Sequence, residues 1–159
     1  GATSIGPYCM AGGEIKNSVL FGYSNKAHDG YLGDSVIGEW CNLGAGTSNS
    51  NIKNTGGEVK YLTDNNVVPI AAGNKAGLLM GDYSRCAINT SFNTGTVIGV
   101  CCNIFGEMPG KYLHHFTWGR ERYIFEKALL DISNWKKMKG HELSKPEIKT
   151  LKKLYTINL

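Results

Sequence analysis

The chain contains no long hydrophobic run and no CxxC motif, and it is poor in proline. No apolar run approaches the roughly 20 residues that a membrane-spanning helix needs. We therefore expect no membrane anchor, and no secretory signal peptide is recognised. The 5 cysteines are an odd number without CxxC spacing, which argues against a zinc or redox site. Because Cys41, Cys86 and Cys101 have apolar neighbours, we expect reduced core thiols in a cytoplasmic protein.

Positive charge is concentrated near the C-terminus. The formal net charge is +4, and 7 of the lysines fall between Lys136 and Lys153. This distribution is typical of a solvated helical face, and a phosphate-rich partner is the alternative. No recognition motif and no alternation of aromatic and basic residues accompanies the charge, so we expect no nucleic-acid partner.

Glycine is abundant, with 21 residues against 4 prolines, and it occurs among Val, Ile, Leu and Cys rather than in polar tracts. This composition indicates a backbone that turns sharply and often. Apolar residues recur every six positions: Met80, Cys86, Phe92, Ile98 and Ile104. A period of six fits neither an amphipathic helix nor a simple strand alternation. It predicts an all-β solenoid, a parallel β-helix of hexapeptide repeats in which three hexads form one coil.

Two breaks in the repeat predict the domain organisation. Residues 1–110 are expected to form the β-helix, with residues 48–66 as an inserted polar loop. Residues 111–159 are expected to form a C-terminal extension with two helices. The first helix should end at Gly140, and Ser144 with Glu147 should form a capping box for the second. We expect these helices to cap an open solenoid end or to pack against a neighbouring chain.

The segment 16–60 carries a specific motif. Lys16 is followed by SNKAH ending at His28, then by YLGD from Tyr31, IG, and NLGAGT from Asn42. These residues and spacings resemble the acetyltransferase domain of bifunctional glucosamine-1-phosphate N-acetyltransferase/N-acetylglucosamine-1-phosphate uridylyltransferases, in a divergent branch described from Bacteroidetes-type bacteria. The resemblance implies that the β-helix is left-handed, that the chain forms a homotrimer, and that a sugar nucleotidyltransferase domain precedes residue 1.

The activity that the resemblance implies is acetyl-CoA-dependent N-acetylation of an amino-sugar 1-phosphate, such as glucosamine-1-phosphate, in UDP-N-acetylglucosamine synthesis. His28 is expected to be the catalytic base, because an imidazole with a pKa near 6.5 can accept a proton at neutral pH. Asp29 or another acceptor would orient its ring. Substrate-binding roles fall to four residues: Lys16, Tyr31, Asn42 and Lys60. Because the loop before Lys60 is longer than in the family, Lys26 is the alternative second phosphate-binding lysine.

The coenzyme contacts implied by the resemblance are Ala45, Asn51, Asp82 and Val100. The family has tyrosine after the residue matching Asn51, where this chain has Ile52, and it has serine and alanine where this chain has Asp82 and Val100. An aspartate directed at a polyphosphate would be repulsive.

Other functions remain open. These departures favour a second hypothesis, a non-catalytic β-helix that trimerises or regulates a nucleotidyltransferase. A third hypothesis is acyl transfer in which the acceptor is another amino sugar or the donor is another acyl-CoA. His114 and His115 suggest comparison with zinc-binding hexapeptide-repeat carbonic anhydrases. Neighbouring side chains on an extended segment point in opposite directions, so we expect no metal there.

Overall fold

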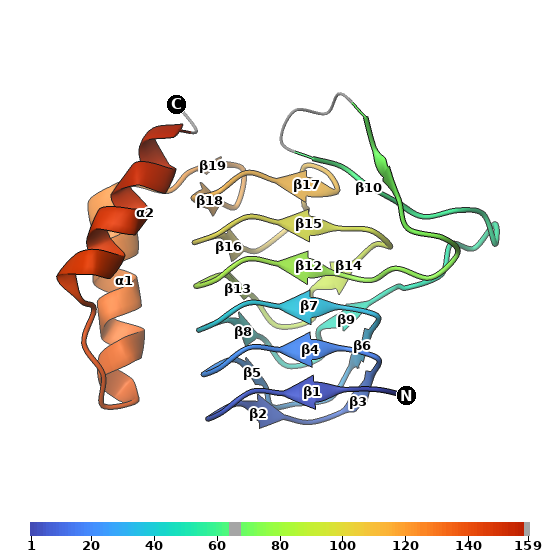
Figure 1. Ribbon diagram of the computed structural model, residues 1–159, viewed down its shortest axis with the longest axis horizontal. Helices are drawn as coiled ribbons and strands as arrows, with labels where there is room; N and C mark the ends of the chain where they lie inside the picture. Colours follow the sequence, from blue (N-terminus) through green and yellow to red (C-terminus); the bar gives the residue numbers. More distant parts are fainter. Residues whose placement is uncertain (64–67, 158–159) are drawn as a thin grey trace.

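The computed structural model describes residues 1–63 and 68–157, and it shows a left-handed parallel β-helix beside two α-helices (Figure 1). The predicted fold class is therefore confirmed. One face, sheet A, contains β1 (Ser4–Ile5), β4 (Val19–Leu20), β7 (Val36–Ile37), β12 (Leu79–Met80), β15 (Val97–Ile98) and β17 (Tyr112–Leu113). The second, sheet B, contains β2 (Met10–Ala11), β5 (Asn25–Lys26), β8 (Asn42–Leu43), β13 (Arg85–Cys86), β16 (Asn103–Ile104), β18 (Thr117–Trp118) and the antiparallel β19 (Glu121–Arg122). The third, face C, contains β3 (Glu14–Lys16), β6 (Tyr31–Gly33), β9 (Ser48–Asn49) and β14 (Ser91–Phe92).

The core fills the inside of the coils, because alternate side chains of each short strand point to opposite sides of the sheet. The apolar residues predicted from the six-residue period are all buried: Met80, Cys86, Phe92, Ile98 and Ile104. Lys26 and Asn49 are polar exceptions at inward positions. The Asn49 side chain is satisfied there by the main-chain N–H and carbonyl of Gly33.

The solenoid continues beyond the predicted boundary at residue 110. Strand β17 pairs in parallel with β15, and β18 pairs with β16. The hexad period is lost after Gly106 because residues 106–110 cross directly to sheet A without forming a strand on face C. A shorter coil therefore hides the last strands from a search for period six.

The inserted segment leaves face C after β9 and returns at β12. It contains the antiparallel pair β10 (Lys60–Tyr61) and β11 (Ile70–Ala71), on the right of Figure 1. The predicted loop 48–66 began too early, because Ser48–Asn49 pairs with β14 inside the solenoid. Residues 64–66 of that prediction lie outside the described residues.

The corners between sheet A and sheet B, which we call the A–B corner, form a column of non-glycine residues in left-handed conformation, most of them aromatic. Tyr23, Trp40, Tyr83, Cys101 and Phe116 have φ between 57° and 62°. Such a conformation costs an L-residue about 1–2 kcal/mol. The Tyr23 and Trp40 rings stack with centroids 4.2 Å apart, and packing of this kind offsets the cost.

The two helices pack along this column. Helix α1 (Phe125–Met138) and helix α2 (Lys145–Ile157) lie beside the A–B corner, on the left of Figure 1, and leave the solenoid end open. The expectation that they cap that end is therefore wrong. Gly140 follows α1 with φ of 77°, and Ser144 and Glu147 exchange hydrogen bonds before α2, so both predicted helix boundaries are confirmed. Apolar residues of the helices reach the corner and bury Cys101 and Phe116.

Candidate functional site

His28 lies exposed on the corner between sheet B and face C, which we call the B–C corner. In the register of sheet B, Asn25 pairs with Asn42, so the corner residue His28 lies next to Ala45 of the following coil. Gly30 has φ of 104°, and a Cβ there would lie 2.1 Å from the Thr47 carbonyl oxygen. Glycine at this position therefore allows the two corners to approach closely. The imidazole and the main chain of Ala45 share one edge of the solenoid.

Asp29 connects these two corners. Its Oδ1 accepts a hydrogen bond from the Gly46 N–H at 3.1 Å. This contact uses the carboxylate to fix the His28 corner against the Ala45 corner. The Asp29 carboxylate, which was expected to orient the imidazole, instead binds the main chain of the next coil.

Lys16 and Tyr31 meet on face C. Lys16 is paired with Gly33 in the register of β3 and β6. The Tyr31 ring folds over Gly33, where a Cβ would lie 2.1 Å from the phenol oxygen. Only glycine leaves room for that ring, so the hydroxyl of Tyr31 stands beside the strand position opposite Lys16. His28, three residues before Tyr31, begins the same face.

Asn51 completes this group. Its Nδ2 donates to the Tyr31 hydroxyl at 3.0 Å and to the Asp34 carboxylate at 2.5 Å. Burial, and then the charge of Asp34, raises the pKa of Tyr31, so the phenol remains a proton donor near neutral pH. Asp34 was not predicted as a site residue, although it ends the YLGD motif that was the available signal.

Asn42 lies on a different face from these residues. It begins β8 in sheet B, between Asn25 and Arg85 in the register. Both neighbours contact the helical region: Lys139, directly after α1, donates to the Asn25 amide oxygen, and the Arg85 guanidinium lies 4.8 Å from the ring centroid of Trp135 in α1. Within one protomer, Asn42 therefore faces the helices rather than the His28 edge.

The two candidate second lysines differ in accessibility. Lys60 is exposed in β10 of the inserted segment. Lys26 has only 1% of its surface exposed, and its ammonium is directed at main-chain oxygens inside the B–C corner. The alternative that Lys26 holds the sugar phosphate is therefore wrong, because a buried ammonium with three protein acceptors cannot reach that ligand.

The remaining predicted coenzyme contacts lie at the A–B corner. Asp82 and Val100 occupy adjacent coils, where the Cys101 N–H donates to the Asp82 carbonyl at 2.9 Å. Together with Leu151 of α2 they line a mainly apolar cavity of about 340 Å³. The Asp82 Oδ1 accepts from the Glu39 N–H at 2.7 Å, so the carboxylate supports its own corner. The coenzyme set is thus divided: Ala45 is at the B–C corner and Asn51 is with Tyr31 on face C, whereas Asp82 and Val100 are at the A–B corner.

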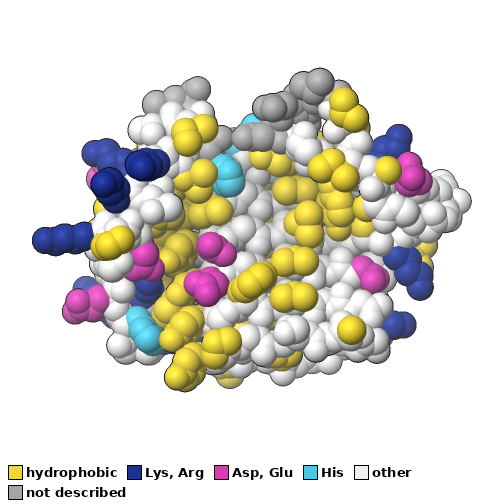
Figure 2. Space-filling model, viewed as in Figure 1, with side chains coloured by type: hydrophobic (Ala, Val, Ile, Leu, Met, Phe, Trp, Pro, Cys, Tyr) yellow, Lys and Arg dark blue, Asp and Glu magenta, His cyan; other side chains and the backbone are white. Residues whose placement is uncertain are grey.

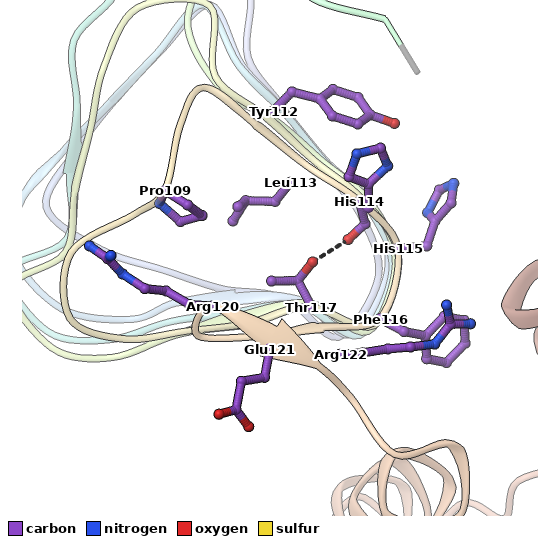
Figure 3. A pocket seen from close by; sticks show the side chains of 10 residues that line it. All are labelled: Pro109, Tyr112, Leu113, His114, His115, Phe116, Thr117, Arg120, Glu121 and Arg122. Carbon is purple, nitrogen blue, oxygen red and sulfur yellow. Dashed lines mark hydrogen bonds between the residues drawn. The ribbon is translucent and has the colours of Figure 1, made fainter. Parts of the chain in front are cut away.

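A pocket of about 400 Å³ lies at the open end of the solenoid (Figure 3). There the Thr117 hydroxyl donates to the His114 carbonyl, while the Val100 N–H donates to Nδ1 of His115. Among residues 1–63 and 68–157, no group of three or more His, Cys, Asp or Glu side chains is arranged to hold a metal. The pocket contains none of the predicted transferase residues.

No α-helix in the described ranges has both the length and the apolar composition required to cross a bilayer.

No protein-family model matches the chain. The chain is 34% identical over 89 residues to the bifunctional protein GlmU of Methanocaldococcus jannaschii. The aligned segment covers 56% of this chain and 21% of that protein. The chain is also 35% identical over 92 residues to a bifunctional sugar-1-phosphate nucleotidylyltransferase/acetyltransferase of Sulfurisphaera tokodaii, covering 58% and 23%.

A shorter match is closer in sequence. The chain is 49% identical over 53 residues to the bifunctional protein GlmU of Rippkaea orientalis, covering 32% of this chain and 12% of that protein. The predicted resemblance to bifunctional sugar-1-phosphate enzymes is therefore confirmed. The matched segment of this chain spans about a fifth of the length of the first two relatives.

Proposed function

We propose that this chain transfers the acetyl group of acetyl-CoA to the amine of an amino-sugar 1-phosphate, with glucosamine-1-phosphate as the leading acceptor. The observation that carries the proposal is the edge formed by His28, Tyr31 and Lys16. An exposed imidazole begins face C, and a phenol and an ammonium group follow on that face. The names of the matched relatives, which include a sugar-1-phosphate nucleotidylyltransferase/acetyltransferase, support the same class of reaction.

The reaction needs one proton acceptor and two bound substrates. The nitrogen of the sugar amine attacks the thioester carbonyl carbon, and His28 takes a proton from that nitrogen during the attack. The carbon–nitrogen bond forms, and the resulting tetrahedral oxyanion collapses with cleavage of the carbon–sulfur bond. The coenzyme A thiolate leaves and recovers the proton from the imidazolium. The products are an N-acetylamino-sugar phosphate and the free thiol of coenzyme A.

Each site residue has a chemical role in this proposal. Lys16 binds the sugar phosphate as a point charge, and the phenol of Tyr31 donates a hydrogen bond to the sugar or its phosphate. Main-chain groups of Ala45 place the thioester next to His28, because the two residues are neighbours in adjacent coils. Asn51 approaches the coenzyme from the same face while holding Tyr31. Lys60 supplies a second positive charge from the inserted segment.

A homotrimer that associates through sheet A is part of this proposal. The outward residues of sheet A are mostly apolar: Val19, Val36, Leu79, Val97 and Tyr112. Figure 2 shows hydrophobic side chains gathered over the strands of this sheet. A flat apolar face of this kind favours association. Sedimentation equilibrium measures the assembly directly.

A non-catalytic β-helix is the second candidate. It is favoured by Asp82, whose carboxylate is occupied by the Glu39 N–H, and by the cavity wall that α2 places beside Val100. In that case the domain would assemble or regulate a nucleotidyltransferase. The free thiols of Cys41 and Cys86 support a reducing compartment such as the cytoplasm for either function.

Calorimetry with acetyl-CoA separates the two candidates. An acetyltransferase gives a saturable heat of binding, followed by thiol release when glucosamine-1-phosphate is added. A structural module gives neither signal. Parallel assays with other amino-sugar phosphates and other acyl-CoA donors identify the substrate pair, because the highest kcat/KM marks the preferred one.

A further inference from the structure

Lys26 is a lysine inside the coil of a β-helix, where apolar residues normally stand. Its side chain occupies the inward position of β5, and 1% of its surface is exposed. Its Nζ donates to three main-chain carbonyl oxygens: Gly12 at 3.3 Å, His28 at 3.0 Å and Asp29 at 2.9 Å. An ammonium group has three N–H donors, so every donor has an acceptor.

Two of the three acceptors belong to the corner that displays His28. The carbonyl groups of His28 and Asp29 therefore point into the solenoid toward the ammonium, and the imidazole is left on the outside. The third acceptor, Gly12, belongs to the preceding coil and donates its own N–H to the Lys26 carbonyl at 2.7 Å. Lys26 thus joins two coils beneath the proposed base.

The glycines of the preceding coil make room for this arrangement. A Cβ at Gly12 would lie 2.3 Å from the Ala27 carbonyl oxygen. At Gly13, where φ is 73°, a Cβ would lie 2.9 Å from the His28 carbonyl oxygen and 3.0 Å from the Lys26 ammonium. The Gly12–Gly13 pair therefore permits a contact that side chains would block.

The corner is also held from the following coil. The Asp29 side chain accepts a hydrogen bond from the Gly46 N–H. The segment His28–Asp29 is therefore held by Lys26 from inside the solenoid and by Gly46 from the next coil. Burial lowers the pKa of Lys26, and the Asp29 charge opposes that change. Three carbonyl acceptors match the charged form, because a neutral amine has only two N–H donors.

We propose that Lys26 is a positioning residue, which holds the His28 corner from inside the solenoid so that the imidazole meets the sugar amine in reactive geometry. This inference rests on the proposed acetyl transfer. Substrates contact the outside of the corner, so Lys26 affects turnover through His28 and leaves substrate binding unchanged. A small displacement of a catalytic group lowers rate strongly without removing binding contacts.

The test compares Lys26→Met with Lys111→Met. Lys111 is a matched control, because its Nζ also donates to a corner carbonyl, that of Thr94 at 2.7 Å, in a coil remote from His28. We expect Lys26→Met to lower kcat by about 10- to 100-fold while the KM of both substrates changes less than twofold. Lys111→Met should leave kcat within twofold. Lys26→Gln, which restores two N–H donors, should fall between wild type and Lys26→Met.

A second readout does not depend on activity. Amide hydrogen exchange at Gly46, whose N–H is bound by Asp29, should be at least about tenfold faster in Lys26→Met than in Lys111→Met. If wild type transfers no acetyl group, the proposed function fails while the exchange result still tests the anchor. Should Lys26→Met not fold, Lys26→Gln carries both measurements. Wild-type kcat in a folded Lys26 variant, or unchanged exchange at Gly46, would overturn the inference.

Discussion

The amide of Asn51 donates a hydrogen bond to the hydroxyl of Tyr31 at 3.0 Å, across 20 positions of the sequence. One of these residues is a proposed substrate contact and the other a proposed coenzyme contact. The bond therefore couples the two binding functions on face C. Asp34 accepts from the same amide and keeps it oriented.

This coupling predicts non-additive effects of substitution. Tyr31→Phe and Asn51→Ala should each raise the KM for glucosamine-1-phosphate, and the double variant should raise it by less than the product of the two. Residues that share a hydrogen bond typically show interaction energies of about 0.5–3 kcal/mol. Steady-state kinetics on the four proteins measures the cycle. Strictly multiplicative effects would show that Asn51 does not act through Tyr31.

Lys16 should control the affinity for the sugar phosphate. Lys16→Met is expected to raise the KM for the sugar phosphate by about 10- to 100-fold, the range that a hydrogen bond to a charged group gives. The KM for acetyl-CoA should stay constant, and the effect should shrink at high salt because exposed charges are screened. Lys75→Met, an exposed lysine of the inserted segment, is the control. Equal KM values for the two variants would remove Lys16 from the site.

Gly30 should be intolerant of a side chain. Its φ of 104° and the 2.1 Å approach of a Cβ to the Thr47 carbonyl predict that Gly30→Ala destabilises the fold by at least about 1–2 kcal/mol. Gly110 has no atom within 4 Å of a built Cβ, so Gly110→Ala is the matched control. Urea denaturation compares the two. A wild-type midpoint for Gly30→Ala would contradict the close approach of these corners.

The helical tail should loosen in acid through Glu147. Burial alone would raise the pKa of this carboxyl, but hydrogen bonds from Lys136, Ser144 and Tyr83 lower it to about 2. A group whose folded pKa is lowered contributes stability above its unfolded pKa, near 4.5, and loses that contribution as pH falls toward about 2. As the pH is lowered between these values, the melting temperature should therefore fall more steeply for wild type than for Glu147→Gln. Parallel pH profiles would contradict this linkage.

The local repeats of the sequence predicted the solenoid because each inward residue is set by its own hexad. Met80 and Ile98 could be placed inside the coil from spacing alone, and Gly140 marked a helix end by its own backbone freedom. Phe116 and Trp40 were not predicted at corners, because large residues with positive φ depend on neighbours in other coils and on the helices. Contacts of that kind leave no periodic signal.

The site was predicted in part for the same reason. Tyr31 and Lys16 lie on the same face of the solenoid, since both positions follow from the register of β3 and β6. The burial of Lys26 could not be foreseen, because lysine is the residue least expected at an inward position. Asn42 does not share the corner with His28, because it pairs with Asn25 in sheet B, three residues before His28, and so lies on a strand of sheet B rather than at the B–C corner.

The most direct test of the proposed transferase is the turnover of His28→Ala, compared with His114→Ala at the open end of the solenoid. With acetyl-CoA and glucosamine-1-phosphate saturating, His28→Ala should lower kcat by about 10²- to 10⁴-fold, the usual contribution of a general base. Its melting temperature should equal that of wild type, because the imidazole is exposed. His114→Ala should retain wild-type kcat. Undiminished turnover by a folded His28→Ala protein would contradict the proposal.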